Sequence, residues 1–217
     1  MESGPKAMTP YRESLKERII TSAMHSFAQK GIKAVKMDDI AAELSVSKRT
    51  LYELYSDKEN LLFEGVRKYH AQKQKEVDEL IRNGDNVMSI ILDIYLLKLK
   101  ELSVTSPLFY RDLTKYPQIL AYMRKDKEKN RDRYLEFMQR GVAEGYFRKE
   151  VNYDLISYLF DAVGSYMMEH LFEKYRFEEL FVNMIFVPLR GFCTNKGVMV
   201  LDHFLTQHSK TNNNKDE

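Results

Sequence analysis

The chain has 217 residues, of which 44% are hydrophobic and 30% are charged, and its formal net charge is +2. These values are typical of a folded, water-soluble protein with one large or two small domains, and they argue against wholesale disorder. The net charge is too small to identify a nucleic-acid-binding protein by itself. Any such function must come from the local arrangement of charged residues.

Several classes of protein are disfavoured by what the chain lacks. No run of 18 uncharged apolar residues is present, so we expect no transmembrane helix, and residues 1–6 lack the apolar core of a secretory signal. The single cysteine, Cys193, excludes an intrachain disulfide and a zinc site built on paired cysteines. We therefore expect a reducing, cytoplasmic location, with no metal and no cofactor.

Apolar residues recur at spacings of three and four along most of the chain, whereas the alternation typical of strands is absent. The pattern predicts an all-α protein. We expect a helix-turn-helix domain with an N-terminal arm over residues 1–60, followed by a helical regulatory, ligand-binding and dimerisation domain over residues 61–217.

In chain order, residues 1–11 are predicted to be a loose arm, and a capping box at Ser14 opens the first helix, which Gly31 ends. Two short helices follow, separated by a break at residues 45–47, with Ser47 capping the second of them. Ser56 is predicted to cap a long helix that reaches about residue 81. Further helices are expected over residues 86–102, 107–114, 117–145, 152–175 and 178–206, with a kink at Pro188.

Residues 38–55 carry the clearest functional signal. Two short helices separated by a three-residue turn must cross steeply, so that Ile40, Leu44 and Leu51 converge on one small core around Ala41. This arrangement is helix-turn-helix geometry. The second helix opens with the sequence SKRT from Ser47, which supplies donors and a positive helix end for phosphates and base edges.

Residues 39–52 (DIAAELSVSKRTLY) and 55–61 (YSDKENL) closely resemble the DNA-binding domain of the TetR family of bacterial regulators. The first helix is similar to that family's in the spacing of Ile19, Ile20, Ala23, Phe27 and Gly31. The resemblance covers about residues 12–66. It implies a homodimer with a variable C-terminal domain that binds a small molecule or senses another cue.

Three residues depart from the family pattern. Ser45 stands where the turn usually has glycine, so it must adopt a left-handed conformation at some cost. Lys36 replaces the usual Thr or Ser cap of the second helix, which weakens that cap. Arg49 replaces a small residue and adds a long donor-rich side chain, so the operator sequence is expected to differ from those of better-known relatives.

The expected DNA contacts are Lys36, Ser47, Lys48, Arg49, Thr50, Tyr52 and Lys58. Lys48 and Lys58 are expected to contact phosphates rather than bases. Tyr52 either hydrogen-bonds a phosphate, which we favour, or packs against the protein. Arg49 either reads a guanine or holds another phosphate.

The C-terminal half is rich in aromatic residues and methionine that could line an apolar cavity with a few polar tips. The candidate ligand-binding residues are Tyr95, Phe109, Tyr134, Phe137, Phe160, Tyr166, Met167 and His170. For each of them plain core packing is the alternative, and His170 could equally be a hydrogen-bonded core histidine. Burial near Phe192 would make Cys193 inert rather than a redox sensor.

The last helices carry more apolar surface than one helix pair needs. We expect dimerisation through a face made of Phe181, Met184, Ile185, Pro188, Leu189 and Phe192, giving a four-helix bundle with the partner. A two-fold dimer would bind an inverted repeat in double-stranded DNA. The resemblance implies that an effector shifts the helix near residues 59–81, which we expect to be the only covalent link between the domains.

The sequence thus predicts a sequence-specific transcriptional regulator, most simply a repressor released by an apolar or aromatic effector. One alternative is a helical small-molecule-binding protein or enzyme in which the helix-turn-helix is structural. No sequence motif of a hydrolase, metalloprotease or nucleotide-binding enzyme is present, so we expect no enzymatic activity. A second alternative, a non-specific DNA-binding protein, would call for more excess positive charge. The ratio of specific to non-specific DNA affinity separates these functions.

Overall fold

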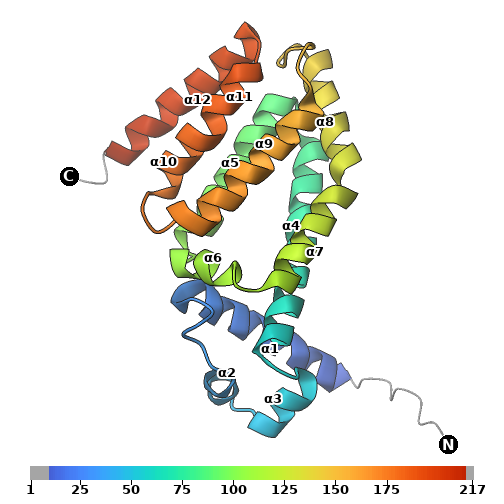
Figure 1. Cartoon of the computed structure of the whole chain (residues 1–217), viewed down its shortest axis with the longest axis vertical. Helices are drawn as coiled ribbons and strands as arrows, with labels where there is room; N and C mark the ends of the chain where they lie inside the picture. The colour runs from blue at the N-terminus through green and yellow to red at the C-terminus, as the bar shows by residue number, and fades with distance from the viewer. Residues whose placement is uncertain (1–9, 214–217) are drawn as a thin grey trace, which may run out of the picture. The chain divides into compact units, whose positions relative to one another are not determined.

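The computed structural model describes residues 10–213, and side chains up to residue 208. The α-helices are α1 (Pro10–Lys30), α2 (Met37–Glu43), α3 (Lys48–Leu54), α4 (Lys58–Asn83), α5 (Val87–Ser103), α6 (Pro107–Leu113), α7 (Pro117–Lys129), α8 (Arg131–Ala143), α9 (Tyr153–Tyr166), α10 (Phe177–Phe181), α11 (Val187–Phe192) and α12 (Asn195–Asn213) (Figure 1). Two π-helical turns, Met167–Leu171 and Val182–Phe186, interrupt the C-terminal part. Within the described residues the only β-type pairing is an isolated bridge between Phe147 and Cys193, so the all-α prediction is confirmed.

The chain forms two compact units that share α4 and α7. The first unit contains residues 10–73 and 104–120, and the second contains residues 74–103 and 121–213. The chain therefore passes between the units three times, and the prediction that the helix near residues 59–81 is the only covalent link is wrong. The assignment of functions to residues 1–60 and 61–217 remains a prediction.

The first unit has its own hydrophobic core. Helix α1 buries Leu15, Ile19, Ala23 and Phe27, which recur at helical spacing along one side. Helix α1 begins at Pro10, a residue favoured in a first helical turn, so the predicted start at Ser14 is wrong. Residues 1–9 of the predicted arm lie outside the described residues.

Side-chain caps begin several of the helices. The hydroxyl of Ser47 accepts a hydrogen bond from the Thr50 amide, and that of Ser106 accepts one from Leu108. The Asn152 side chain caps α9. For α4, Asp57 rather than Ser56 accepts the amide of Asn60, because the Ser56 hydroxyl donates to the Asp57 carboxylate instead.

The second unit is built around α5, which packs against α8, α10 and α12. Its core is rich in aromatic rings. The ring of Tyr95 lies 4.7 Å from that of Phe181 and 4.9 Å from that of Phe186, and the rings of Phe147 and Phe192 are 5.4 Å apart. Much of the aromatic content of this half is therefore ordinary core.

Two predicted long helices are broken in the structure. The helix expected over residues 117–145 divides at Asn130 into α7 and α8. The helix expected over residues 178–206 contains the π-turn before Pro188 and then stops at Cys193, where the backbone becomes extended. Pro188 cannot donate to a carbonyl in the preceding turn, which explains the local defect. The break at Cys193 was missed, although the hydroxyl of Thr194 accepts from the Gly197 amide as an N-cap does.

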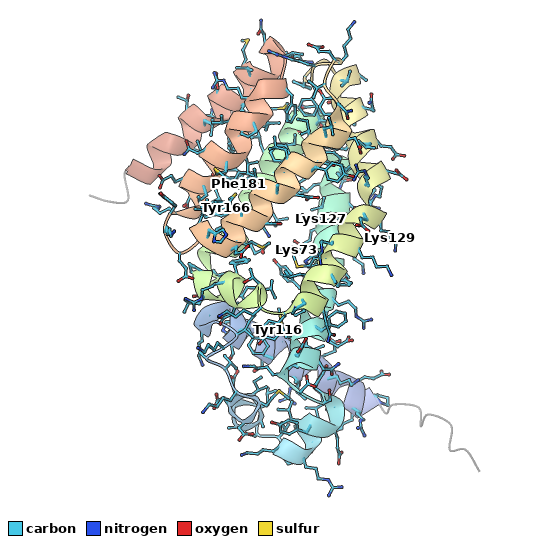
Figure 2. All side chains as sticks on the ribbon, viewed as in Figure 1. Lys73, Tyr116, Lys127, Lys129, Tyr166 and Phe181 are labelled. Atoms are coloured by element: carbon cyan, nitrogen blue, oxygen red, sulfur yellow. The ribbon has the colours of Figure 1, made fainter. Side chains whose placement is uncertain are left out.

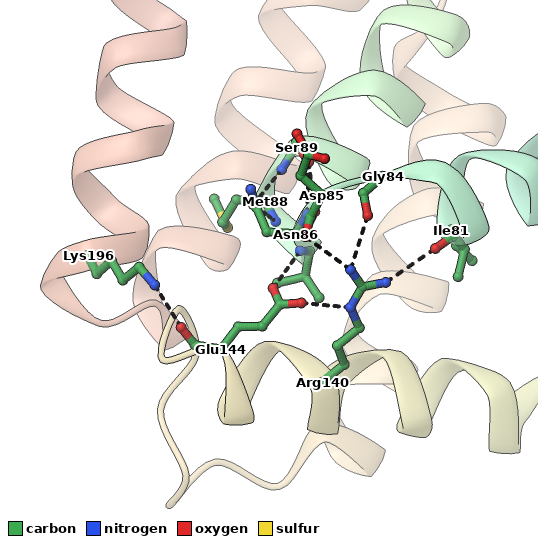
Figure 3. Close-up of polar contacts among 10 residues, drawn as sticks. Ile81, Gly84, Asp85, Asn86, Met88, Ser89, Arg140, Glu144 and Lys196 are labelled. Carbon is green, nitrogen blue, oxygen red and sulfur yellow. Dashed lines mark hydrogen bonds and ion pairs between the residues drawn. The ribbon is translucent and has the colours of Figure 1, made fainter.

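An ion pair between Arg140 and Glu144 of α8 binds the backbone at the junction between α4 and α5 (Figure 3). Nε of Arg140 donates to the Glu144 carboxylate at 2.6 Å, and its terminal nitrogens donate to the carbonyls of Ile81 and Gly84 at 3.2 and 3.1 Å. The other carboxylate oxygen of Glu144 accepts the Val87 amide at 2.8 Å. The last carbonyls of α4 and the first amide of α5 are thereby both bound by α8.

Among the described helices none combines the length and apolarity that crossing a membrane requires. The described residues also bring together no group of three histidine, cysteine or carboxylate side chains suited to a metal ion.

Candidate DNA-binding interface and regulatory core

Helices α2 and α3 form the predicted helix-turn-helix. Ile40 and Ala41 of α2 and Leu51 of α3 are buried together with Leu54. In the turn, the amide of Val46 donates to the carbonyl of Ala41 at 3.0 Å. The φ angle of Ser45 is +54°, so this serine does adopt the left-handed conformation for which related turns use glycine.

The outward side of α3 presents polar and aromatic residues to solvent. The side chains of Lys48 and Arg49 are 65% and 89% exposed, and Tyr52 is 46% exposed. Ser47 is exposed and Thr50 is half-buried, and their hydroxyls lie 2.7 Å apart. The structure therefore brings these five predicted DNA contacts together at the N-terminal turns of one short helix, where a recognition helix carries its base-reading side chains.

Carboxylates hold two of the cations on this surface. Nζ of Lys48 lies 2.5 Å from the Asp38 carboxylate, and Nε of Arg49 donates to Glu53 at 2.9 Å. Both hydrogen bonds raise the pKa of the cation, and the bond from Arg49 also lowers the pKa of Glu53. Exposed pairs of this kind contribute little to stability, so phosphates or base edges can replace the carboxylates at small cost.

Lys36 is the last residue of the loop that precedes α2, and Lys58 at the start of α4 contacts the same loop. The Lys36 side chain is exposed and does not cap α2, as expected, while its amide donates to the Asp39 carboxylate. The ammonium of Lys58 donates to the carbonyls of Ile32 and Val35 at 3.0 and 3.1 Å. Two of its three donors are thus engaged within the protein, which does not favour the predicted phosphate contact.

The geometry agrees with comparisons to known proteins. Residues 19–64 match the model of the family described as "Bacterial regulatory proteins, tetR family". The match identifies this part of the chain as a DNA-binding domain of the TetR family. The chain is therefore a DNA-binding regulator, and the curated relatives that it matches are transcriptional repressors.

One such relative is the HTH-type transcriptional repressor KstR2 of Mycolicibacterium smegmatis, which is 22% identical over 149 residues covering 66% of this chain and 72% of the relative. Among solved structures, a putative transcriptional regulator from Saccharomonospora viridis in complex with choline has a TM-score of 0.68 at 15% identity, covering 84% of this chain and 100% of the other. The "ketosteroid transcriptional regulator KstR2" of Mycobacterium tuberculosis has a TM-score of 0.54 at 16% identity, covering 83% and 96%. These structures show that the TetR fold extends over both units.

The predicted ligand-binding residues do not all converge. Tyr95, Tyr134, Phe137 and Phe160 pack in or against one hydrophobic cluster of the second unit. The other four lie elsewhere. Phe109 is in α6 of the first unit, and Met167 is buried in the π-turn after α9. Tyr166, labelled in Figure 2, and His170 are exposed. The rings of Tyr166 and His170 contact each other at 4.7 Å on the surface, so His170 is not the buried histidine that was considered.

Among the predicted ligand-binding residues, Tyr134 in α8 has a hydroxyl group that lacks a hydrogen-bond partner. Its hydroxyl is buried without a hydrogen-bond partner, and burial, the dominant effect, raises its pKa to about 12. A buried hydroxyl without a partner is costly unless something else supplies an acceptor. This hydroxyl is therefore the best-defined polar feature of the aromatic cluster.

A groove of about 730 Å³ in the second unit was not predicted from the sequence. It lies between the end of α4 and α5, and its lining includes Leu80, Leu96 and Leu97 with charged residues at its edge. Leu80, Leu96 and Leu97 look like ordinary members of the apolar helix pattern in the sequence. Only the relative rotation of the two helices leaves Leu96 open to solvent, with 38% of it exposed.

The residues of the predicted dimer face differ in their burial. Leu189 and Phe192 belong to the core of the second unit, where Phe192 contacts the rings of Phe147 and Tyr153, so neither offers surface to a partner. Phe181, Met184, Ile185 and Pro188 are half-buried. A group of exposed apolar side chains lies instead along α9 and at the start of α11: Leu155, Tyr158, Leu159, Tyr166 and Val187.

Cys193 is fully buried, and burial raises the pKa of its thiol to about 11. The thiolate is therefore scarce at neutral pH. This agrees with the expectation that the residue is inert.

Proposed function

We propose that this chain is a homodimeric transcriptional repressor that binds an inverted repeat in double-stranded DNA and is released by a small, largely apolar or aromatic effector. The observation that carries the proposal is α3, which is capped by Ser47 and presents Lys48, Arg49 and Tyr52 from its first turns. Its charges are held by exposed carboxylates that DNA can displace. Lys36 adds an exposed cation at the entry to α2.

The exposed stripe on α9 supports the dimer. Leu155, Tyr158 and Leu159 are 64%, 56% and 45% exposed, and they recur with Tyr166 at spacings that place them on one face. An apolar helical stripe left open in a protomer is typical of an interface that a second copy covers. This stripe replaces Leu189 and Phe192 in the proposed interface. Two-fold symmetry would then present two copies of α3 to two half-sites.

The hydrophobic cluster that contains Tyr95, Tyr134, Phe137 and Phe160 supports the proposal that the effector is largely apolar. The Tyr134 hydroxyl needs an acceptor, and an effector with one polar group among apolar atoms would supply it. One structural relative is a ketosteroid transcriptional regulator and another was solved in complex with choline, so a ketosteroid and choline are the first compounds to test. An effector that prefers the DNA-incompetent state about 100-fold would supply roughly 2.7 kcal/mol per site.

Selection of bound sequences from a random double-stranded DNA pool tests the DNA-binding function. We expect enrichment of an inverted repeat, with the selected DNA bound at least about 10³-fold more tightly than random DNA. Uniform recovery of all sequences would contradict specific regulation and favour non-specific binding. Titrating the selected complex with a ketosteroid and with choline then tests release, and replacing Tyr134 by Phe should weaken the response to a compound that uses its hydroxyl.

A further inference from the structure

Helix α6 comes from the middle of the chain but belongs to the same compact unit as the helix-turn-helix. The amide of Ser106, just before α6, donates to the carbonyl of Ala28 in α1 at 2.7 Å. Gly31, with a φ of +81°, ends α1 against Leu108, and a side-chain Cβ at Gly31 would stand 2.9 Å from the Leu108 Cβ. The end of α1 and the start of α6 are therefore fitted closely, with no room for a larger residue.

The carboxylate of Asp112 joins α6 to the loop that follows α1. Asp112 is 2% exposed, and its Oδ2 accepts the backbone amide of Lys33 at 2.8 Å. Its Oδ1 lies 3.3 Å from Nζ of Lys115 and 3.7 Å from Nε of Arg111. Burial, the largest single effect, favours the neutral acid, but the Lys33 amide and the two cations outweigh it and lower the pKa of Asp112. A buried carboxylate with these partners stays ionised.

The loop of residues 31–36 is also bound by a side chain of α4. The ammonium of Lys58 binds the carbonyls of Ile32 and Val35, which flank the amide of Lys33 in sequence. The loop leads directly into α2 at Met37, where the Asp39 carboxylate accepts the Lys36 amide but the Lys36 side chain caps nothing. The far end of α2 is bound to α1, because the Glu43 carboxylate accepts the hydroxyls of Ser22 and Ser26 at 2.7 and 3.3 Å. The two attachments of residues 31–36 thus contribute the support at the N-terminal end of α2, and through it they affect α3.

We propose that Asp112 is a positioning residue for DNA binding, which sets the place of the helix-turn-helix through the amide of Lys33. Residues 104–120 are joined to the second unit at both ends, so a displacement of that segment reaches α2 through Asp112 as well as through α4. This inference rests on the proposed DNA-binding function and adds a second route by which an effector controls it.

Amide hydrogen exchange and DNA affinity test the inference on the full-length protein. In Asp112→Ala we expect the Lys33 amide to exchange about tenfold faster, and the affinity for the selected inverted repeat to fall about tenfold, as for loss of a hydrogen bond to a charged acceptor. Asp112→Asn keeps an acceptor oxygen without the charge, so its Lys33 exchange rate and its DNA affinity should lie between those of the wild type and Asp112→Ala. The same variant tests the inference if Asp112→Ala does not fold. Asp132→Ala, which removes an exposed aspartate of α8, is the matched control and should behave as wild type.

A second readout separates coupling from a merely structural role. Binding of the selected DNA should change exchange in both α3 and residues 104–120 of the wild type. In the Asp112 variants the change in α3 should remain and the change in residues 104–120 should be lost. Folded Asp112 variants with wild-type Lys33 exchange and wild-type affinity would overturn the inference. If the selection yields no preferred DNA, the proposed function fails, whereas the Lys33 exchange still decides whether Asp112 holds the loop.

Discussion

Arg49 illustrates how a single residue can give this regulator its own operator. It stands where relatives often carry a small residue, its side chain is 89% exposed, and it donates to Glu53 only through Nε. The terminal nitrogens of the guanidinium keep the fork geometry that matches O6 and N7 of guanine. We therefore propose that Arg49 reads a base rather than holding a phosphate.

Replacing Arg49 by Ala should weaken binding to the selected DNA by about 1–3 kcal/mol and relax the preference at one base position in each half-site. Lys48→Ala is the matched comparison, because loss of a phosphate contact should weaken all sequences about equally and reduce the salt dependence. Fluorescence anisotropy with a panel of single-base variants measures both effects. An unchanged base preference in Arg49→Ala would contradict base reading.

Ser45 holds a conformation that costs an L-amino acid about 1–2 kcal/mol, since its φ is +54°. Ser45→Gly should therefore stabilise the protein by about 0.5–1 kcal/mol after the greater flexibility of glycine in the unfolded chain is counted. Ser45→Ala keeps the Cβ that causes the strain, so it should bring no gain. Urea denaturation of both variants tests this, and equal stability of the Gly and Ala variants would exclude strain at this turn.

At the scale of elements, the junction of α4 and α5 depends on one side chain from α8. Arg140 binds two carbonyls at the end of α4 and orients Glu144 on the first amide of α5 (Figure 3). Helix ends that are partly buried need such partners for their unpaired backbone groups. The end of the helix that leads back to the DNA-binding unit is thereby fixed within the second unit.

Arg140→Ala should lower the free energy of unfolding by about 2–3 kcal/mol, because it leaves carbonyls and a carboxylate without their charged partner. Arg133→Ala removes an arginine from the same helix that pairs with Asp78 at the surface, and it should cost less than about 1 kcal/mol. Thermal or chemical unfolding compares the two variants. Equal losses would show that the contacts at the α4–α5 junction are no stronger than a surface pair.

At the scale of the whole molecule, we expect the open stripe on α9 to form the dimer interface. Leu159→Glu should place a charge in the proposed interface, produce a monomer at micromolar concentration, and weaken binding to an inverted repeat because only one recognition helix is then presented. Met199 in α12 is 73% exposed, so Met199→Glu tests an apolar-to-acidic change away from the stripe. Light scattering gives the oligomeric state, and a Leu159→Glu protein that stays dimeric would place the interface elsewhere.

Much of the helix-turn-helix follows from local sequence. Ser47, Ser106 and Asn152 cap helices where their side chains reach amides two or three residues ahead, and Ser45 adopts the turn conformation that the spacing requires. Such interactions span a single turn of helix, so a sequence pattern contains them completely. The wrong start of α1, and the exchange of the Ser56 cap for Asp57, show that neighbouring caps compete within a few residues.

The sequence by itself therefore determined the all-helical class, the helix-turn-helix and the residues on the outward side of α3. Tertiary structure alone decided which apolar residues are core and which are surface: Leu189 and Phe192 face inward, whereas Leu155 and Leu159 face solvent. It also decided that Asp112 and Lys58 meet one loop from two different helices. The physical reason is that periodicity defines the apolar side of a helix, whereas the rotation and partners of that side are set by packing between residues that lie far apart in the chain.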